Sequence, residues 1–415
     1  MAENVQLSST TGALLNDINS ILAARTLEIA QNELRFYQLG EKLQNADGTG
    51  KIWKAIRYNR VNLPRVTLTE GTTPDGSALT TTAVTGTAEQ WGAYISLSDV
   101  DQLVLAHPVL QKSNELLGIN AAEVLDREVQ NVLESATTLK YGDAVTGRAA
   151  ITATGILGTT EVATMVSTLR NNGARPFDGQ YYVGIIDPSV EMDMILDTQF
   201  VAAAEYSNIK ALYNGEVGMW MGVRWIRSNF VRTYYGLGVQ TGISGAGGTL
   251  TTGSYAVKCV GYDSTYRLKM SISNAVDVVV TIATGTLNVT TPNSPTGYKW
   301  DIYSVAGSGG TPLKNSATGE YNVTGGSSVT VSAVGTGAAA PAAPLTGLTV
   351  HNVWVFGKGG FGVTELTGIQ RTLTDGKATD SDPLAQRRKT GWKAFFKAII
   401  LDDNNYGKTE VASNF

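Results

Sequence analysis

Apolar residues at helical spacing predict three helices, and a capping signal predicts a fourth. A leading helix before Gly40 is expected from Leu14, Ile18, Ile21 and Leu22. The longest helix is expected within residues 110–137, where one stripe collects Leu117, Ala121, Val124, Leu125, Val132, Leu133 and Ala136. A third is expected after Thr160, from the i, i+3, i+4, i+7 series Val162, Met165, Val166 and Leu169. Asp187-Pro188 predicts the start of a fourth, because aspartate caps helices well and proline suits the first helical position.

Alternating apolar and polar positions predict strands between these helices. Residues 51–60 alternate with period two, and the turn-rich segment 68–86 follows them. This pattern predicts a long projecting hairpin whose return strand is 87–97 and which cannot bury itself. Strict alternation over 217–225 predicts one half-buried strand, and the chain is expected to close on a strand at 390–401.

The pattern changes between about residues 232 and 347. Helical periodicity disappears, and short alternating strands are separated by Gly, Ser, Asn and Pro turns, which is typical of a β-sandwich. The expected strands are 254–260, 277–282, 298–305 and 328–334. Tyr298, Trp300 and Ile302 are expected in the sandwich core rather than on a sugar-binding platform. An Ala- and Pro-rich exit linker is expected at 335–347.

The chain contains few charged residues. Charged residues make up 16% of the 415 residues, below the roughly 25% of ordinary domains, so neighbouring molecules are expected to cover much of the surface. The net charge of −4 excludes a nucleic-acid-binding polycation. The single Cys259 excludes an intramolecular disulfide. Neither a secretory signal nor a membrane span is expected, so cytosolic synthesis fits.

Candidate catalytic groups are sparse. Structural roles are expected for the two histidines, His107 and His351. The string GKGGFG at 357–362 lacks the order of a phosphate-binding loop and is expected to belong to strands. A solvated helix face is the expectation for the carboxylates Glu191, Asp193 and Asp197. No catalytic, metal-binding or cofactor-binding residue is predicted, and the chain is expected not to be an enzyme.

One compact basic run stands out near the C-terminus. Arg387, Arg388 and Lys389 could contact DNA phosphates or an acidic neighbour. A plain solvated loop is the alternative, and it is favoured.

Several blocks of sequence, in order, resemble one protein family. The blocks are FYQLGEK (36–42), LTEGTTP (68–74), WGAYISLSDV (91–100), LLGINAAEVLDREV (116–129), GARPFDGQYYVGIIDPSVEMDM (173–194), GEVGMWMGVRWIRSNF (215–230), VWVFGKGGFGVTEL (353–366) and QRRKTGWKAFFKAIIL (386–401). Together they resemble the major capsid proteins of tailed bacteriophages, which have the Hong Kong 97-type fold. The similarity covers about residues 25–231 and 348–412.

The resemblance implies an α+β fold with named parts. They are an N-terminal arm and leading helix (1–50), an E-loop hairpin (51–97), a peripheral domain with the spine helix (98–159), an axial domain in two parts (160–231 and 348–370), an inserted immunoglobulin-like or fibronectin-like sandwich (232–347), and a C-terminal strand returning to the peripheral domain (371–415). The insertion departs from the plain family pattern. Within the E-loop, contacts between subunits are expected from Arg60, Arg65, Glu70 and Asp75.

The implied function is that of a major capsid protein. Its copies would assemble as pentamers and hexamers into the icosahedral head that encloses phage DNA, after synthesis in the host cytoplasm. The implied partners are other copies, scaffolding, portal and decoration proteins, and packaged double-stranded DNA, with no membrane and no cofactor. Two alternatives stay open: an encapsulin-like compartment shell, and a secreted glycan-binding protein or glycoside hydrolase with a β-sandwich module.

Overall fold

The chain divides into two structural units. The computed structural model describes residues 34–44, 50–58, 61, 63, 67, 70–71, 76, 78–98, 109–177, 179–197, 216–239, 242–263, 268–281, 285–292, 295, 298–315, 323–324, 326–331, 333–373, 384 and 386–415. Unit 1 comprises Met1–Ser135 and Gly359–Asp403, and unit 2 comprises Ala136–Lys358 and Asn404–Phe415. The predicted N-terminal arm, the start of the leading helix and His107 lie outside the described residues.

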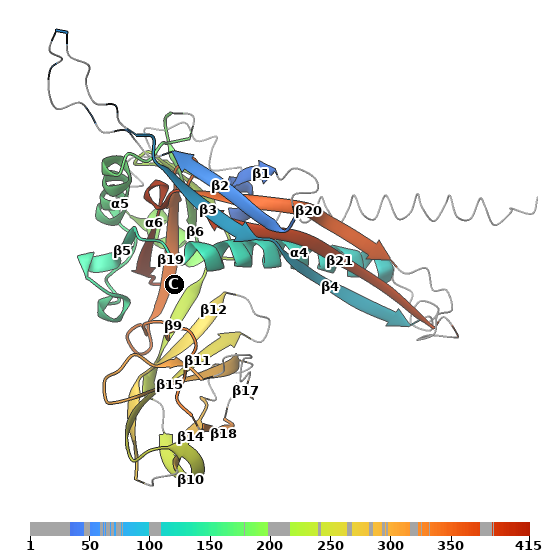
Figure 1. Cartoon of the computed structure of the whole chain (residues 1–415), viewed down its shortest axis with the longest axis vertical. Helices are drawn as coiled ribbons and strands as arrows, with labels where there is room; N and C mark the ends of the chain where they lie inside the picture. The colour runs from blue at the N-terminus through green and yellow to red at the C-terminus, as the bar shows by residue number, and fades with distance from the viewer. Residues whose placement is uncertain are drawn as a thin grey trace, which may run out of the picture. The chain divides into compact units, whose positions relative to one another are not determined.

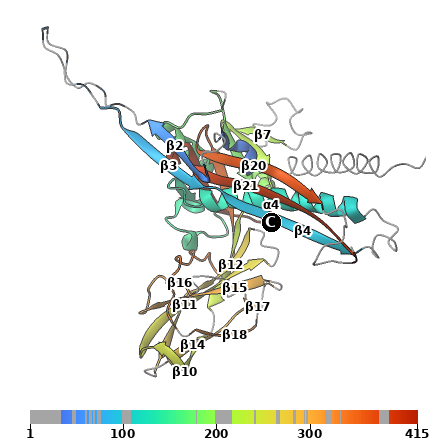
Figure 2. The same ribbon diagram turned by 45° about the vertical axis from the view of Figure 1, so that its right-hand side comes forward.

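Unit 1 is built on a four-stranded sheet with the order β1-β20-β21-β4. Its elements are α2 (Phe36–Leu39), β1 (Glu41–Gln44), β4 (Glu89–Ser98), α4 (Val109–Leu133), β20 (Phe361–Leu373) and β21 (Arg387–Ile400). The predicted long helix is confirmed as α4, which packs on β21 and β4 and runs beside them in both views (Figures 1 and 2). Trp392 of β21 points to this helix and donates to Asn120 Oδ1 at 3.0 Å.

The hairpin of unit 1 differs from the predicted one in its return strand. β2 (Ile52–Tyr58) pairs along its whole length with β3 (Thr81–Thr87). The segment predicted as the return strand is instead mostly β4, which pairs with β21. Thr81–Thr87 was missed because both of its faces are largely exposed, so it carries no apolar alternation to recognise.

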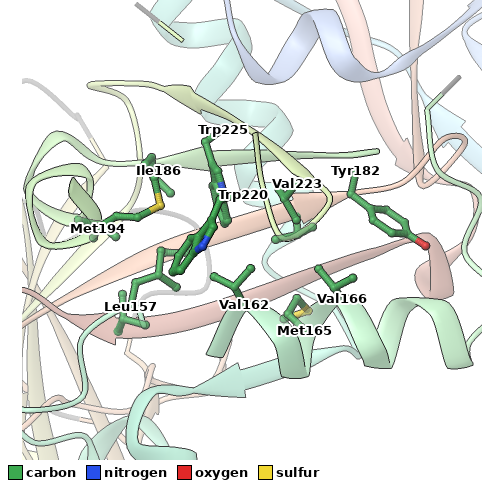
Figure 3. Packing of buried hydrophobic residues seen from close by; sticks show 14 of the residues in the cluster. Leu157, Val162, Met165, Val166, Tyr182, Ile186, Met194, Trp220, Val223 and Trp225 are labelled. Atoms are coloured by element: carbon green, nitrogen blue, oxygen red, sulfur yellow. The ribbon is translucent and has the colours of Figure 1, made fainter. Parts of the chain in front are cut away.

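Unit 2 has its core where two helices cover a central sheet. The elements are α5 (Thr159–Asn171), β6 (Tyr182–Ile186), α6 (Pro188–Leu196), β7 (Glu216–Trp220), β8 (Val223–Arg227) and β19 (Thr349–Phe356). Both predicted helices are confirmed, and Asp187 caps α6 by accepting the Ser189 N–H at 3.4 Å. Figure 3 shows apolar side chains of the helices and the sheet packed together, among them Val162, Met165, Met194, Trp220 and Trp225.

Residues 217–225 form a hairpin rather than the single strand that was predicted. β7 and β8 pair antiparallel, and Trp220 faces Val223 across a two-residue turn. Met221 and Gly222 both have positive φ, 53° and 78°, which is the geometry of a type I′ turn. Such a short turn does not disturb the alternation of side chains, so the pattern alone could not reveal it.

The predicted all-β region of unit 2 contains the strands β9 to β18. They are β9 (Thr233–Val239), β10 (Gly242–Leu250), β11 (Gly253–Asp263), β12 (Lys269–Asn274), β13 (Val276–Val280), β14 (Gly285–Thr290), β15 (Tyr298–Ala306), β16 (Leu313–Lys314), β17 (Val323–Thr324) and β18 (Ser328–Val331). All of them except β13 and β16 are labelled in Figure 1. The sheet β10-β14-β18 shares a buried apolar cluster with β11, β13 and β15. Trp300 and Ile302 lie in this cluster, as predicted, whereas Tyr298 is only half-buried and packs against it. An immunoglobulin-like or fibronectin-like character stays a prediction.

These strands are continuous with the central sheet of unit 2. β9 pairs with β19 through Thr233–Tyr235 and in parallel with β12 on its other side. The sheet order is β16-β15-β11-β12-β9-β19-β6-β8-β7. The predicted boundary at residue 232 therefore lies next to a strand shared by both parts.

The chain does not close on the strand that was predicted last. After β21 and the short turn η4 (Asp403–Asn405), β22 (Tyr406–Ala412) pairs with β19 and is buried at every position. β22 also pairs with β5 (Leu139–Tyr141), which leads into the short helices η1 (Gly142–Ala144) and η2 (Arg148–Ala150).

Candidate functional site

The ribbon formed by β2 and β3 presents apolar side chains to solvent. Ile52, Ile56 and Tyr58 on one face of β2 are 66%, 54% and 66% exposed. On the other face, Trp53 and Ala55 are only half-buried. A two-stranded ribbon alone is marginally stable, and no apolar side chain of this one gains full burial from the described residues of its own chain. The ribbon is therefore a surface suited to another molecule.

The base of the ribbon is held on unit 1 by two contacts. A Cβ added to Gly86 would lie 2.5 Å from Ile399 Cγ2, so only glycine allows β3 to approach β21 this closely. Arg57 Nη1 lies 2.9 Å from Asp402 Oδ1. Both contacts position the ribbon, and neither covers Ile52 or Ile56.

Of the four residues predicted to contact a neighbouring subunit, the structure describes Glu70. Glu70 is exposed and precedes Gly71, whose φ is 79°. Arg60, Arg65 and Asp75 lie outside the described residues. The role of all four residues stays a prediction.

The basic run at 387–389 lies in a strand, so the favoured expectation of a solvated loop was wrong. Arg387 and Lys389 begin β21 and pair with Ser98 and Ser96 of β4. Both side chains are exposed, and Lys389 Nζ lies 5.9 Å from the centre of the Tyr94 ring. Arg388 belongs to the same strand, but its side chain is outside the described set.

A buried carboxylate holds the segment that leads out of the N-terminal region. Asp126 of α4 is 1% exposed and accepts backbone N–H groups of Arg35 at 2.8 Å, Phe36 at 3.3 Å and Tyr37 at 3.0 Å. Burial raises the pKa of Asp126 to about 6, although the three N–H donors and the charge of Arg35 act in the opposite direction. The Asp126 carboxylate therefore caps the N-terminus of α2.

Sequence reasoning missed this anchor, although one signal was present. Asp126 lies four residues after Ala122 and three before Val129, and all three belong to the buried face of α4. A charged residue in phase with an apolar stripe indicates a buried partner. That partner could not be named, because it lies about 90 positions earlier in the chain.

A second carboxylate secures the same segment from β20. The Tyr37 hydroxyl donates to Glu365 Oε1, and Lys42 Nζ lies 3.1 Å from the same oxygen. Burial raises the pKa of Tyr37 strongly, with Glu365 adding to the effect. Residues 34–44 are therefore joined to both α4 and β20.

Comparison with known proteins identifies the family. The family model described as phage capsid protein matches residues 77–288, about half of the chain. The chain belongs to the phage capsid protein family. The capsid of cyanophage Pam1 is similar in structure, with a TM-score of 0.53 and 10% identity over 93% of this chain and 92% of that one. An acid-stable capsid structure of Helicobacter pylori bacteriophage KHP30 gives a TM-score of 0.50 and 9% identity over 92% and 91%. No curated protein matches.

These findings confirm the predicted α+β, Hong Kong 97-type fold and the role of a phage capsid protein, a structural component of the virion shell. Capsid proteins of this family build multimeric shells from many copies. Along the described part of the capsid protein, none of the helices combines the length and apolar character that a membrane crossing needs.

The carboxylates near α6 of the capsid protein do not converge on a cleft. Glu191 lies 3.6 Å from Arg227. Asp193 is 5% exposed and accepts the Asn414 N–H at 3.2 Å, so the expectation of a solvated face was wrong for this residue. Within the residues that the structure describes, no three His, Cys, Asp or Glu side chains are grouped so that they could hold a metal ion.

The remaining candidate groups of the capsid protein, His351 and the GKGGFG string, lie in or next to strands. His351 lies in β19, with Nδ1 3.1 Å from Asp187 Oδ2. The string GKGGFG was expected to belong to strands, but its first four residues lie between β19 and β20, and its last two belong to β20. Gly357 is packed tightly, because an added Cβ would lie 2.8 Å from the Arg175 carbonyl oxygen.

Proposed function

We propose that this capsid protein assembles as pentamers and hexamers into the icosahedral head that encloses phage DNA, and that the β2–β3 ribbon lies on an adjacent copy. One observation carries the proposal: the ribbon exposes a row of apolar side chains that its own unit leaves uncovered. A neighbouring copy would bury this row and supply the missing packing.

Closure of a shell strengthens such modest contacts. Ordering an exposed ribbon costs conformational entropy, which burial against a neighbour offsets. Each contact need bury only on the order of 800 Å² per partner, because many contacts act together in a closed shell. The low charge content of 16% suits a surface that is largely covered in this way.

The parts of the chain receive roles within this proposal. They are an N-terminal arm (1–50), an E-loop (51–97), a peripheral domain (98–159), an axial domain (160–231 and 348–370), an inserted module (232–347) and a returning C-terminal strand (371–415). Scaffolding, portal and decoration proteins are the proposed further partners, and the chain is proposed to have no catalytic activity.

Packaged DNA is the proposed partner of the basic run. Arg387 and Lys389 lie on the face of β21 turned away from α4, and Lys393 continues the same alternation. Positions two residues apart on a strand, such as Arg387 and Lys389, are about 6.6 Å apart, which is roughly two steps of the axial phosphate spacing of about 3.4 Å along one DNA strand. Few such contacts suit a container that must release its DNA, because each neutralised phosphate adds to the affinity.

A substitution in the ribbon tests the assembly proposal. Ile56→Glu places a carboxylate in the middle of the exposed row, where burial of its charge against a neighbour would be strongly unfavourable. We expect this variant to fold but to remain as small species in sedimentation velocity under conditions in which the wild type forms shells. Val279→Glu is the matched control, because Val279 is 57% exposed but lies in β13, away from the ribbon. If Ile56→Glu assembles as readily as the control, the ribbon is not the contact.

A further inference from the structure

A cavity of about 590 Å³ opens in unit 2 beside the N-terminus of α6. It lies between that helix, β9, β12, the start of β15 and β19, and none of the contacts described above uses its open space. Its volume falls in the range of roughly 300–1,000 Å³ that is usual for small-molecule sites. The cavity is lined by polar and aromatic side chains, among them Asp187, Asn229, Tyr235, Lys269, Tyr298 and His351.

A buried histidine lines the cavity. The side chain of His351 is 7% exposed, and its Nδ1 lies 3.1 Å from Asp187 Oδ2. This contact lacks the geometry of a hydrogen bond, so among the described residues Nδ1 is a buried ring atom without a hydrogen-bond partner. A polar group this deeply buried is normally satisfied, which makes an open partner position informative.

The polar groups of the cavity are of mixed type. Asp187 can only accept hydrogen bonds and Lys269 can only donate them, whereas Asn229 and the two tyrosine hydroxyls can do both. An anion would meet the carboxylate of Asp187, and a cation would meet the ammonium of Lys269. Hydroxyl groups both donate and accept, so a neutral polyhydroxylated molecule matches this set best.

The walls of the cavity add flat apolar surface. Tyr235 and Tyr298 are half-buried and line it together with Pro295 and Met270. The Tyr298 ring contacts the Trp300 ring in a tilted arrangement, with ring centres 6.2 Å apart. Aromatic side chains of this kind offer a flat apolar body and a polar tip, which suits a sugar ring with one C–H face and a rim of hydroxyls.

We propose that this cavity binds one neutral saccharide unit, with Asn229, Tyr298 and His351 as hydrogen-bonding residues and Tyr235 as a wall. All lining residues of the site belong to unit 2, whereas the β2–β3 ribbon on which the assembly proposal rests belongs to unit 1. A single unit held by a few hydrogen bonds is expected to bind with a dissociation constant on the order of 1 mM.

Saturation-transfer difference NMR on the full chain tests the proposal. The probes are the methyl glycosides of glucose, galactose, mannose and N-acetylglucosamine, and we expect transfer to the ring protons of at least one. The same measurement with dextran distinguishes a site that binds one unit of a polysaccharide from a site that binds only a free sugar. Absence of transfer from every glycoside and from dextran overturns the proposal.

Substitutions of cavity residues test whether the saccharide binds in this cavity. Asn229→Ala and Tyr298→Phe each remove a hydrogen-bonding group and are expected to weaken binding about tenfold. The matched control is Asn131→Ala, an exposed amide on α4 of unit 1, which is expected to change nothing. Equal binding by all three variants overturns the assignment to this cavity. Displacement of the glycoside by inorganic phosphate also overturns it, because the site would then be an anion site.

Discussion

Asp126 shows how a single buried carboxylate can couple the anchoring of residues 34–44 to pH. Its pKa of about 6 lies above the ordinary value of 3.8, so between these two pH values the folded protein holds a proton that the unfolded chain has released. Stability from this group is therefore greatest at low pH and falls as the pH rises from about 4 to about 6. Two pKa units correspond to about 3 kcal/mol.

We predict that Asp126→Asn removes this pH dependence. The difference in unfolding free energy between the wild type and Asp126→Asn should shift against the wild type by up to about 3 kcal/mol between pH 4 and pH 7. Urea unfolding of both proteins across this range measures the shift. A difference that stays flat, or that grows in favour of the wild type, would contradict the assignment.

Glu410 is the opposite case, a buried carboxylate whose pKa is lowered. Burial alone would raise the pKa, but hydrogen bonds from Arg148 and the charges of Lys408 and Arg148 bring it below its usual value. Arg148 is bidentate, with Nε 2.7 Å from Oε2 and Nη2 2.6 Å from Oε1. Its Nη1 also donates to the Ala342 carbonyl oxygen at 2.9 Å, so the pair joins β22 to the segment before β19.

We predict that Glu410→Gln destabilises the protein by about 3–5 kcal/mol, because it leaves Arg148 and Lys408 buried without their counter-charge. Thermal or urea unfolding at pH 7 measures this loss. Glu89→Gln is the control: Glu89 is 53% exposed and paired with Lys397, so its loss should cost under about 1 kcal/mol. Equal effects of the two substitutions would show that the buried pair has no special role.

At the residue scale, the sequence predicted apolar burial well and polar burial poorly. Trp300 and Ile302 were expected in a core and are there. The burial of three carboxylates was not predicted, namely those of Asp126, Asp193 and Glu410. A charged group can be buried only with a suitable partner, and for these residues that partner is distant in sequence. Asp193 needs the backbone of Asn414, which follows it by 221 positions.

Among the elements, the β7–β8 hairpin depends on the conformation of one glycine. Gly222 has a φ of 78° at the second turn position, where a side chain is strained. We predict that Gly222→Ala destabilises the protein by about 1 kcal/mol, measured by thermal unfolding. Gly253→Ala is the control, because Gly253 has an ordinary φ and open space around it, and it should be close to neutral. A neutral Gly222→Ala would contradict the turn assignment.

Helices were predictable from sequence because their apolar stripes are local. The strands that were missed lack such a stripe for opposite reasons. Thr81–Thr87 is exposed on both faces and holds few apolar residues. Tyr406–Ala412 is buried on both faces, yet it includes Lys408 and Glu410, which satisfy each other at 3.0 Å. Alternation marks a strand only when one face is buried and the other is wet.

At the scale of the whole molecule, the apolar row of β2 is left uncovered within one copy. The resemblance in sequence predicted the family and the fold, whereas the described hairpin β2–β3 identifies which side chains are left uncovered. Which surface receives them depends on a second copy, and this is why sequence patterns within one chain could not predict it.

Electron microscopy of the purified full chain, over a range of salt and protein concentrations, tests the proposed assembly. We expect closed particles of uniform size with five-fold and six-fold clusters of subunits, in which the apolar row of β2 is covered by the adjacent copy. A chain that stays a monodisperse monomer under all these conditions, or closed particles in which Ile52, Ile56 and Tyr58 remain exposed to solvent, would contradict it.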